Sequence, residues 1–137
     1  MVKLRKALDA AGFKHVGITM EGTWQPLADQ VLTNATFNAS VAAVSEHYPC
    51  TQATAIRNDT QAVAMKAHKK FWAGEETPTP NANWTAAGCW GRKLNQHWVN
   101  LNATSTVSWA VGWSQYPGAS LEFNGNGLLN ASEPWSG

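Results

Sequence analysis

The sequence predicts an α/β fold built on a parallel sheet, and two observations lead to that prediction. Helix-like and strand-like segments alternate along the 137 residues. Each strand-like segment also ends in acidic or aromatic side chains. Repeated helix–strand units give parallel strands because each helix crosses back over the sheet. The length suits one small domain or part of a larger one.

Four helix–strand units follow one another, with hydrophobic spacing that changes between helical and alternating periods. The predicted helices are residues 2–11, 25–32, 61–69 and 86–101, and the predicted strands are residues 15–20, 41–48, 70–75 and 104–113. We expect loops at residues 34–40 and 51–60, and in the Gly/Asn-rich stretch from Pro117 onward. The strands should lie side by side in chain order, with right-handed crossovers.

Four parallel strands form either a small open sheet or part of a (β/α)8 barrel, which takes eight strands and about 250 residues. No Gly-rich phosphate loop follows any strand, so the nucleotide-binding open sheet lacks its main signature. We therefore favour half a barrel, with the other half upstream of Met1.

Six N-x-S/T sequons indicate a glycosylated protein that is lysosomal or secreted: Asn34, Asn38, Asn58, Asn83, Asn102 and Asn130. No signal-peptide core follows Met1, so we expect the N-terminus of the whole protein to lie further upstream. Cys50 and Cys89 would then be in an oxidising compartment, where they could pair.

Composition argues against several other classes of protein. The net charge is +1 and 14% of residues are charged, so nucleic acid is not expected as a partner. No apolar run is long enough for a transmembrane segment. The four histidines lie on different predicted elements without close ligand spacing, and we expect no metal and no cofactor. A Gly-x-Ser-x-Gly nucleophile elbow is also absent.

Acids and aromatic side chains follow the strand-like segments. They are Glu21, the run Glu46–His47–Tyr48, the pair Glu75–Glu76, and the segment that begins at Trp109. Because parallel strands end at one edge, these groups should share a rim that suits sugar cleavage. The alternative is that the acids are merely solvated strand ends and His47 is structural. Trp90, Leu94, Trp98 and Leu101 form a helical stripe that we assign to the core.

Several blocks of sequence resemble the galactosylceramidases, glycoside hydrolase family 59. The blocks are residues 72–76 (WAGEE), 87–96 (AGCWGRKLNQ), 104–109 (TSTVSW) and 133–137 (EPWSG). They follow one another in the family's order, and the resemblance covers essentially the whole chain. The joint occurrence of the GCWGR-x-LNQ and EPWSG blocks is hard to obtain by chance.

The resemblance implies a retaining glycosidase that hydrolyses the β-galactosyl bond of galactosylceramide. Residues 1–137 would be strands five to eight of its TIM barrel, without the N-terminal half and the later domains. Glu75 falls on the catalytic nucleophile, and Trp109, His47 and Tyr48 fall on substrate-binding positions. Glu21 and Glu76 would contact the catalytic and binding residues rather than the substrate. Glu76 stands where the family has an aspartate.

The acid/base residue of the family would lie upstream of Met1, so we expect this polypeptide to be inactive alone. The expected partners are a galactosphingolipid substrate and a lipid-presenting, saposin-like activator. Two other hypotheses stay open: another barrel glycosidase, glucosylceramidase-like or xylanase-like, and a secreted carbohydrate-binding protein without catalysis. An upstream strand ending in Asn-Glu-Pro would favour the enzymes.

Overall fold

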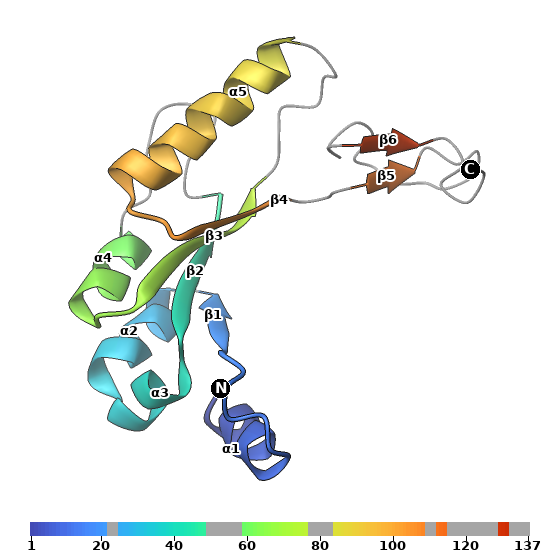
Figure 1. Ribbon diagram of the computed structural model, residues 1–137. Helices are drawn as coiled ribbons and strands as arrows, with labels where there is room; N and C mark the ends of the chain where they lie inside the picture. Colours follow the sequence, from blue (N-terminus) through green and yellow to red (C-terminus); the bar gives the residue numbers. More distant parts are fainter. Residues whose placement is uncertain (22–24, 49–58, 77–83, 109–111, 115–128, 132–137) are drawn as a thin grey trace.

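The computed structural model in Figure 1 describes residues 1–21, 25–48, 59–76, 84–108, 112–114 and 129–131. Four strands form a parallel sheet in the order β1-β2-β3-β4. Their bounds are β1 Thr19–Glu21, β2 Ala43–His47, β3 Lys70–Glu76 and β4 Ser105–Ser108. The predicted mixed α/β class, strand order and parallel direction are therefore confirmed.

Helices α2 to α5 lie along one side of this sheet in Figure 1. The helices are α1 Val2–Ala10, α2 Gln25–Thr33, α3 Ala35–Ser40, α4 Asp59–Lys66 and α5 Trp84–Asn95, which continues as the π-helical segment η1, Gln96–Asn100. The core forms where the helices meet the sheet. Met20, Val44 and Phe71 supply its centre from three neighbouring strands, and each is at most 1% exposed.

The expectation of a loop over residues 34–40 is wrong, because residues 35–40 form helix α3. Asn34 caps this helix: its side-chain oxygen accepts a hydrogen bond from the Phe37 backbone nitrogen at 3.0 Å. Asparagine is among the best N-cap residues, and the sequence carried that signal. Helix α4 likewise begins at Asp59, inside the segment expected as loop, with an acid in its first turn where the helix dipole favours one.

The single strand predicted over residues 104–113 is also wrong. Strand β4 ends at Ser108, and β5, Gly112–Ser114, belongs to a separate two-stranded sheet. Its partner is β6, Leu129–Ala131, which lies in the stretch expected to be loop. Unbroken alternation of Val and Trp predicted one strand, but side-chain alternation does not fix the sheet to which each part pairs.

Of the stripe predicted to form the core, only Leu101 does so, and Trp90 is partly buried. Trp98 is 72% exposed and Leu94 is 48% exposed, whereas Lys93 and His97 are buried. Leu101 is the buried member of the predicted stripe. The helix presents Lys93 and His97 to the sheet because a buried carboxylate, Glu76, lies opposite them.

Strand β3 contains one extra residue relative to both of its neighbours. Ala73 pairs with Glu46 and Glu75 pairs with His47, so Gly74 has no counterpart on β2. The pairing with β4 shifts over the same residues. Such a bulge interrupts the two-residue alternation of side chains. As a result Phe71, Ala73 and Glu76 are buried, while Gly74 and Glu75 are only partly buried.

We expect Gly74→Ala to destabilise the fold. A Cβ atom at this position would lie 2.8 Å from both Cβ and Oγ of Ser45, so the strands would have to move apart. Overpacking of this kind costs roughly 1–3 kcal/mol in the free energy of unfolding, which chemical denaturation measures.

Gly88→Ala is the matched control, because an added Cβ there meets nothing within 4 Å. In a helix this change should stabilise by up to about 1 kcal/mol. Adding Ser45→Gly to Gly74→Ala should restore most of the loss. Equal denaturation midpoints for Gly74→Ala and the unmodified protein would show that the close approach does not constrain the strands.

Candidate functional site

Four polar side chains meet where β1, β2 and β3 end: Glu21, His47, Tyr48 and Glu75. Nε2 of His47 lies 3.2 Å from Oε2 of Glu21, and its Nδ1 lies 3.7 Å from Oε1 of Glu75. The Tyr48 hydroxyl donates a hydrogen bond to the same Oε1 atom. All four belong to the carboxyl ends of parallel strands, the edge at which α/β enzymes place their chemistry.

Tyr48 reaches Glu75 because the backbone turns sharply at the end of β2. Its φ is 50°, in the left-handed region, and its backbone nitrogen donates to the Glu75 carbonyl oxygen at 2.8 Å. A tyrosine seldom adopts this conformation, and such residues persist where the surrounding structure holds them. Two hydrogen bonds to one residue therefore fix Tyr48 against Glu75.

The surroundings of Tyr48 keep its phenol protonated. Burial, the hydrogen bond to Glu75, and the negative charges of Glu75 and Glu76 raise the pKa of Tyr48 to about 12. A neutral phenol can donate a hydrogen bond to a carboxylate, whereas a phenolate would repel it. At neutral pH the Tyr48 hydroxyl is thus a hydrogen-bond donor to Glu75.

Ser45 completes the floor of this site. Its hydroxyl lies 3.2 Å from the Met20 carbonyl oxygen and 3.3 Å from Oε2 of Glu21, and so it links the ends of β1 and β2. Sequence reasoning missed Ser45, since a serine within a buried strand carries no signal of its own. In the structure Ser45 packs directly against Gly74 of the neighbouring strand.

Glu76 lies on the opposite face of the sheet. Its side chain is fully buried, pairs with Lys93 through Oε1, and lies 3.2 Å from Nε2 of His97 through Oε2. Glu46 is also buried, and two-residue alternation along β2 puts it on the same face as the core residue Val44. The structure therefore brings together Glu21, His47, Tyr48 and Glu75, and separates Glu76 from them. Trp109 lies outside the described residues.

Three of the six predicted glycosylation sites have described side chains. The Asn34 oxygen caps α3, and Asn102 is exposed with φ at 51°. Nδ2 of Asn38, the atom that would carry a glycan, donates instead to the Val31 carbonyl oxygen at 2.8 Å. This geometry favours Asn34 and Asn102 over Asn38. Cys50 lies outside the described residues, so its pairing with Cys89 stays a prediction.

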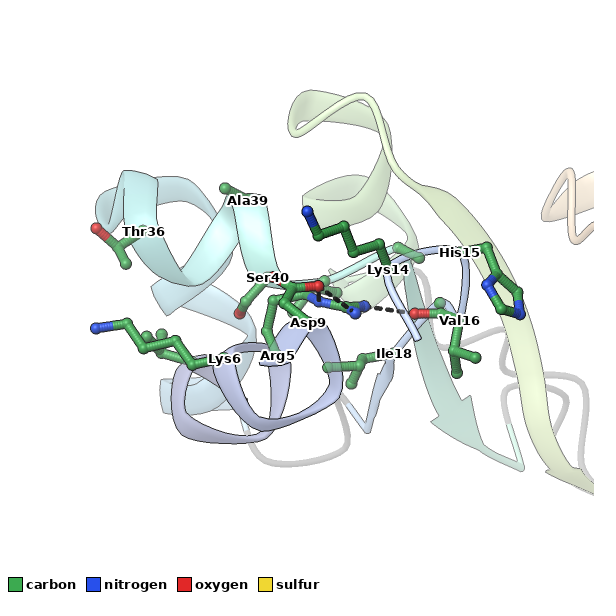
Figure 2. Close-up of a pocket in the computed structure, with 14 residues that line it drawn as sticks. Arg5, Lys6, Asp9, Lys14, His15, Val16, Ile18, Thr36, Ala39 and Ser40 are labelled. Carbon is green, nitrogen blue, oxygen red and sulfur yellow. Dashed lines mark hydrogen bonds and ion pairs between the residues drawn. The ribbon is translucent and has the colours of Figure 1, made fainter. Parts of the chain in front are cut away.

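A cavity of about 700 Å³ lies at the other end of the sheet, between α1, α3 and the segments that lead into β1 and β2. Figure 2 shows Arg5 and Asp9 of α1 beside Val16, with Lys6, Lys14 and His15 around them. Arg5 contacts Asp9 at 2.6 Å and donates to the Phe13 carbonyl oxygen at 2.8 Å. These contacts anchor α1 to the chain that enters β1, away from the four-residue cluster.

Within the described ranges, no group of three or more His, Cys, Asp or Glu side chains is arranged to hold a metal ion. The same portion of the chain contains no helix of the length and apolar character that a membrane crossing requires.

A parallel sheet whose strand ends gather two carboxylates, a histidine and a tyrosine is consistent with a fragment of an α/β glycosidase. The family model of glycosyl hydrolase family 59 matches residues 1–137. The chain belongs to this family.

Curated relatives include the galactocerebrosidases of Danio rerio, 41% identical over 135 residues, Mus musculus, 37% over 136, and Homo sapiens, 35% over 135. Each alignment covers 98% of this chain and only 18–19% of the relative. The chain therefore spans about a fifth of the length of these relatives.

The raised pKa of Tyr48 has a direct spectroscopic test. The difference in phenolate absorbance between the protein and its Tyr48→Phe variant should show no Tyr48 ionisation near the ordinary pKa of about 10. Ionisation should instead centre near pH 12. A midpoint near 10 would mean that neither burial nor the contact with Glu75 shifts the pKa of Tyr48.

The same shift sets a stability window. The folded-state pKa lies above the unfolded value, so this contribution to stability is fully present below pH about 10. It is lost as the pH rises from there through about 12. Tyr48→Phe should remove this part of the alkaline destabilisation.

Proposed function

We propose that this chain is the second half, strands five to eight, of the (β/α)8 barrel of a retaining glycosidase. The proposed reaction is hydrolysis of the β-galactosyl bond of galactosylceramide. The observation that carries the proposal is Glu75, which lies at a strand end with its carboxylate held by Tyr48 and beside His47. Membership of family 59 and the names of the curated relatives supply the substrate class.

Glu75 is the proposed nucleophile. The Tyr48 hydroxyl donates a hydrogen bond to Oε1 of Glu75. We therefore propose that the other carboxylate oxygen, Oε2, forms the bond with the anomeric carbon. Tyr48 stabilises the ionised carboxylate before attack and keeps its two oxygens distinct. The glycosyl–enzyme intermediate is then hydrolysed by water, with retention of configuration.

A retaining glycosidase needs a second carboxyl as acid/base, roughly 5 Å from the nucleophile. In the proposed barrel this residue is supplied by an earlier strand, outside residues 1–137. Glu21 takes a different role: it holds His47 at 3.2 Å and so orients the imidazole beside Glu75. On this proposal the isolated chain would be inactive, because its acid/base carboxyl belongs to the other half of the barrel.

The remaining parts of the proposal concern the cellular setting. A galactosphingolipid is a membrane lipid, and a lipid-presenting, saposin-like activator would bring its sugar to the strand ends. The sequons support a lysosomal or secreted location. Trp109 would contact the sugar, since an indole face suits the apolar face of a galactose ring.

We expect Glu75→Gln in the complete enzyme to lower kcat by several orders of magnitude with little change in substrate binding. Glutamine keeps the shape of the side chain but cannot attack the anomeric carbon. Glu76→Gln should cost far less, because its side chain lies on the other face of the sheet. Steady-state kinetics on a β-galactoside measures both, and Asp29→Asn, an exposed carboxylate on α2, is the control.

A mechanism-based 2-fluoro galactosyl inactivator should label the peptide that contains Glu75. Digestion and mass spectrometry locate the modified residue. A label on Glu76, Glu46 or Glu21, or near-normal turnover by Glu75→Gln, would contradict the assignment.

A further inference from the structure

The adjacent glutamates of β3 are chemically identical, yet they occupy different surroundings. Simple alternation from Phe71 and Ala73 would turn Glu75 toward the helices and Glu76 toward the rim. The extra residue at Gly74 reverses this outcome. A bulge disrupts the ladder of hydrogen bonds between strands. Other contacts must therefore stabilise the bulged strand relative to a regular one.

Lys93, His97 and Thr106 surround Glu76 on the helix-facing side. Nζ of Lys93 contacts Oε1, and Nε2 of His97 lies 3.2 Å from Oε2. Nδ1 of His97 lies 3.0 Å from the Thr106 hydroxyl. Both ring nitrogens of His97 therefore have an oxygen partner, and both carboxylate oxygens of Glu76 have a nitrogen partner.

Because this cluster is buried, it favours one conformation of β3 over the other. Lys93 is 4% exposed, His97 is 1% exposed and Glu76 is not exposed at all. A buried charge is tolerated only where a partner neutralises it, so Lys93 stabilises the arrangement in which a carboxylate of β3 points to α5. In the bulged strand that carboxylate belongs to Glu76, and Glu75 is left on the other face, against Tyr48.

We propose that Lys93 and His97 are positioning residues, which hold Glu76 against α5 and η1 and thereby direct Glu75 to the strand-end cluster with His47 and Tyr48. The proposal deepens the proposed function, on which its enzymatic test rests. Its spectroscopic test stands without that function.

The test compares Lys93→Met with Arg92→Met in the complete enzyme. Arg92 is the neighbouring cation on α5, exposed and bonded to Gln96 at 3.0 Å, and serves as the matched control. Lys93→Met should slow labelling of Glu75 by the fluorosugar by roughly tenfold or more, and lower kcat more than it raises KM. Arg92→Met should leave both unchanged. Normal labelling of Lys93→Met would overturn the proposal.

The double variant Lys93→Met/Glu76→Gln separates positioning from simple loss of stability. A neutral glutamine needs no buried counter-ion and still accepts a hydrogen bond from His97, so labelling should recover to within about threefold of the unmodified enzyme. A double variant that folds but labels as slowly as Lys93→Met would overturn the proposal. If Lys93→Met does not fold, His97→Leu replaces it: slowed labelling supports positioning, and normal labelling refutes it.

The ionisation of Tyr48 tests the positioning proposal even if the fluorosugar does not label Glu75 in the unmodified enzyme. Absence of that label would refute only the proposed function. When Glu75 turns away, Tyr48 loses its hydrogen bond and the nearby negative charge, so its ionisation in Lys93→Met should move down from pH about 12, while burial keeps part of the shift. Loss of the Lys93 cation without repositioning would move the ionisation up instead. An unchanged or upward shift would overturn the proposal.

Discussion

The carboxylate of Glu76 lies completely buried between the sheet and the long helix, and the packing around it follows from that fact. A charge in such a place requires a cation and further hydrogen bonds, which Lys93 and His97 supply. The helix must therefore turn these two residues toward β3. Its apolar residues Leu94 and Trp98 are consequently left on the outer surface.

The burial of Glu76 also affects the strand-end site, because Glu75 is its neighbour on β3. Gly74 lies so close to Ser45 that no larger side chain fits without movement of the strands. The bulge at this glycine turns Glu75 and Glu76 to opposite faces in the sense that leaves Glu75 beside Tyr48. One strand end thus supplies one glutamate for structure and one for the proposed chemistry.

The proposed barrel would cover the two edge strands of this sheet. β1 and β4 are the edges of the four-stranded sheet, and Val107 of β4 is 44% exposed. Unpaired edges of a parallel sheet are normally covered or paired. In the proposed barrel the remaining strands would pair with both edges, and the length of the curated relatives leaves ample chain for them.

The sequence by itself determined the α/β class, the order of the strands and the residues that gather at their carboxyl ends. These features depend on local periodicity and on the rule that parallel strands end at one edge, which needs no knowledge of packing. Glu21, His47, Tyr48 and Glu75 were identified in this way, but the same rule also placed Glu46 and Glu76 at that edge, and both are buried.

Only the tertiary structure decided which face each residue occupies. The apolar stripe containing Trp98 predicted a buried face, but the buried charge of Glu76 outweighed it, since leaving a carboxylate without a partner costs more than exposing an indole. Likewise, the division of residues 104–114 between two sheets depends on pairing with β6, which is distant in sequence. Pairing of this kind is set by contacts across the fold, and no local pattern of side chains records it.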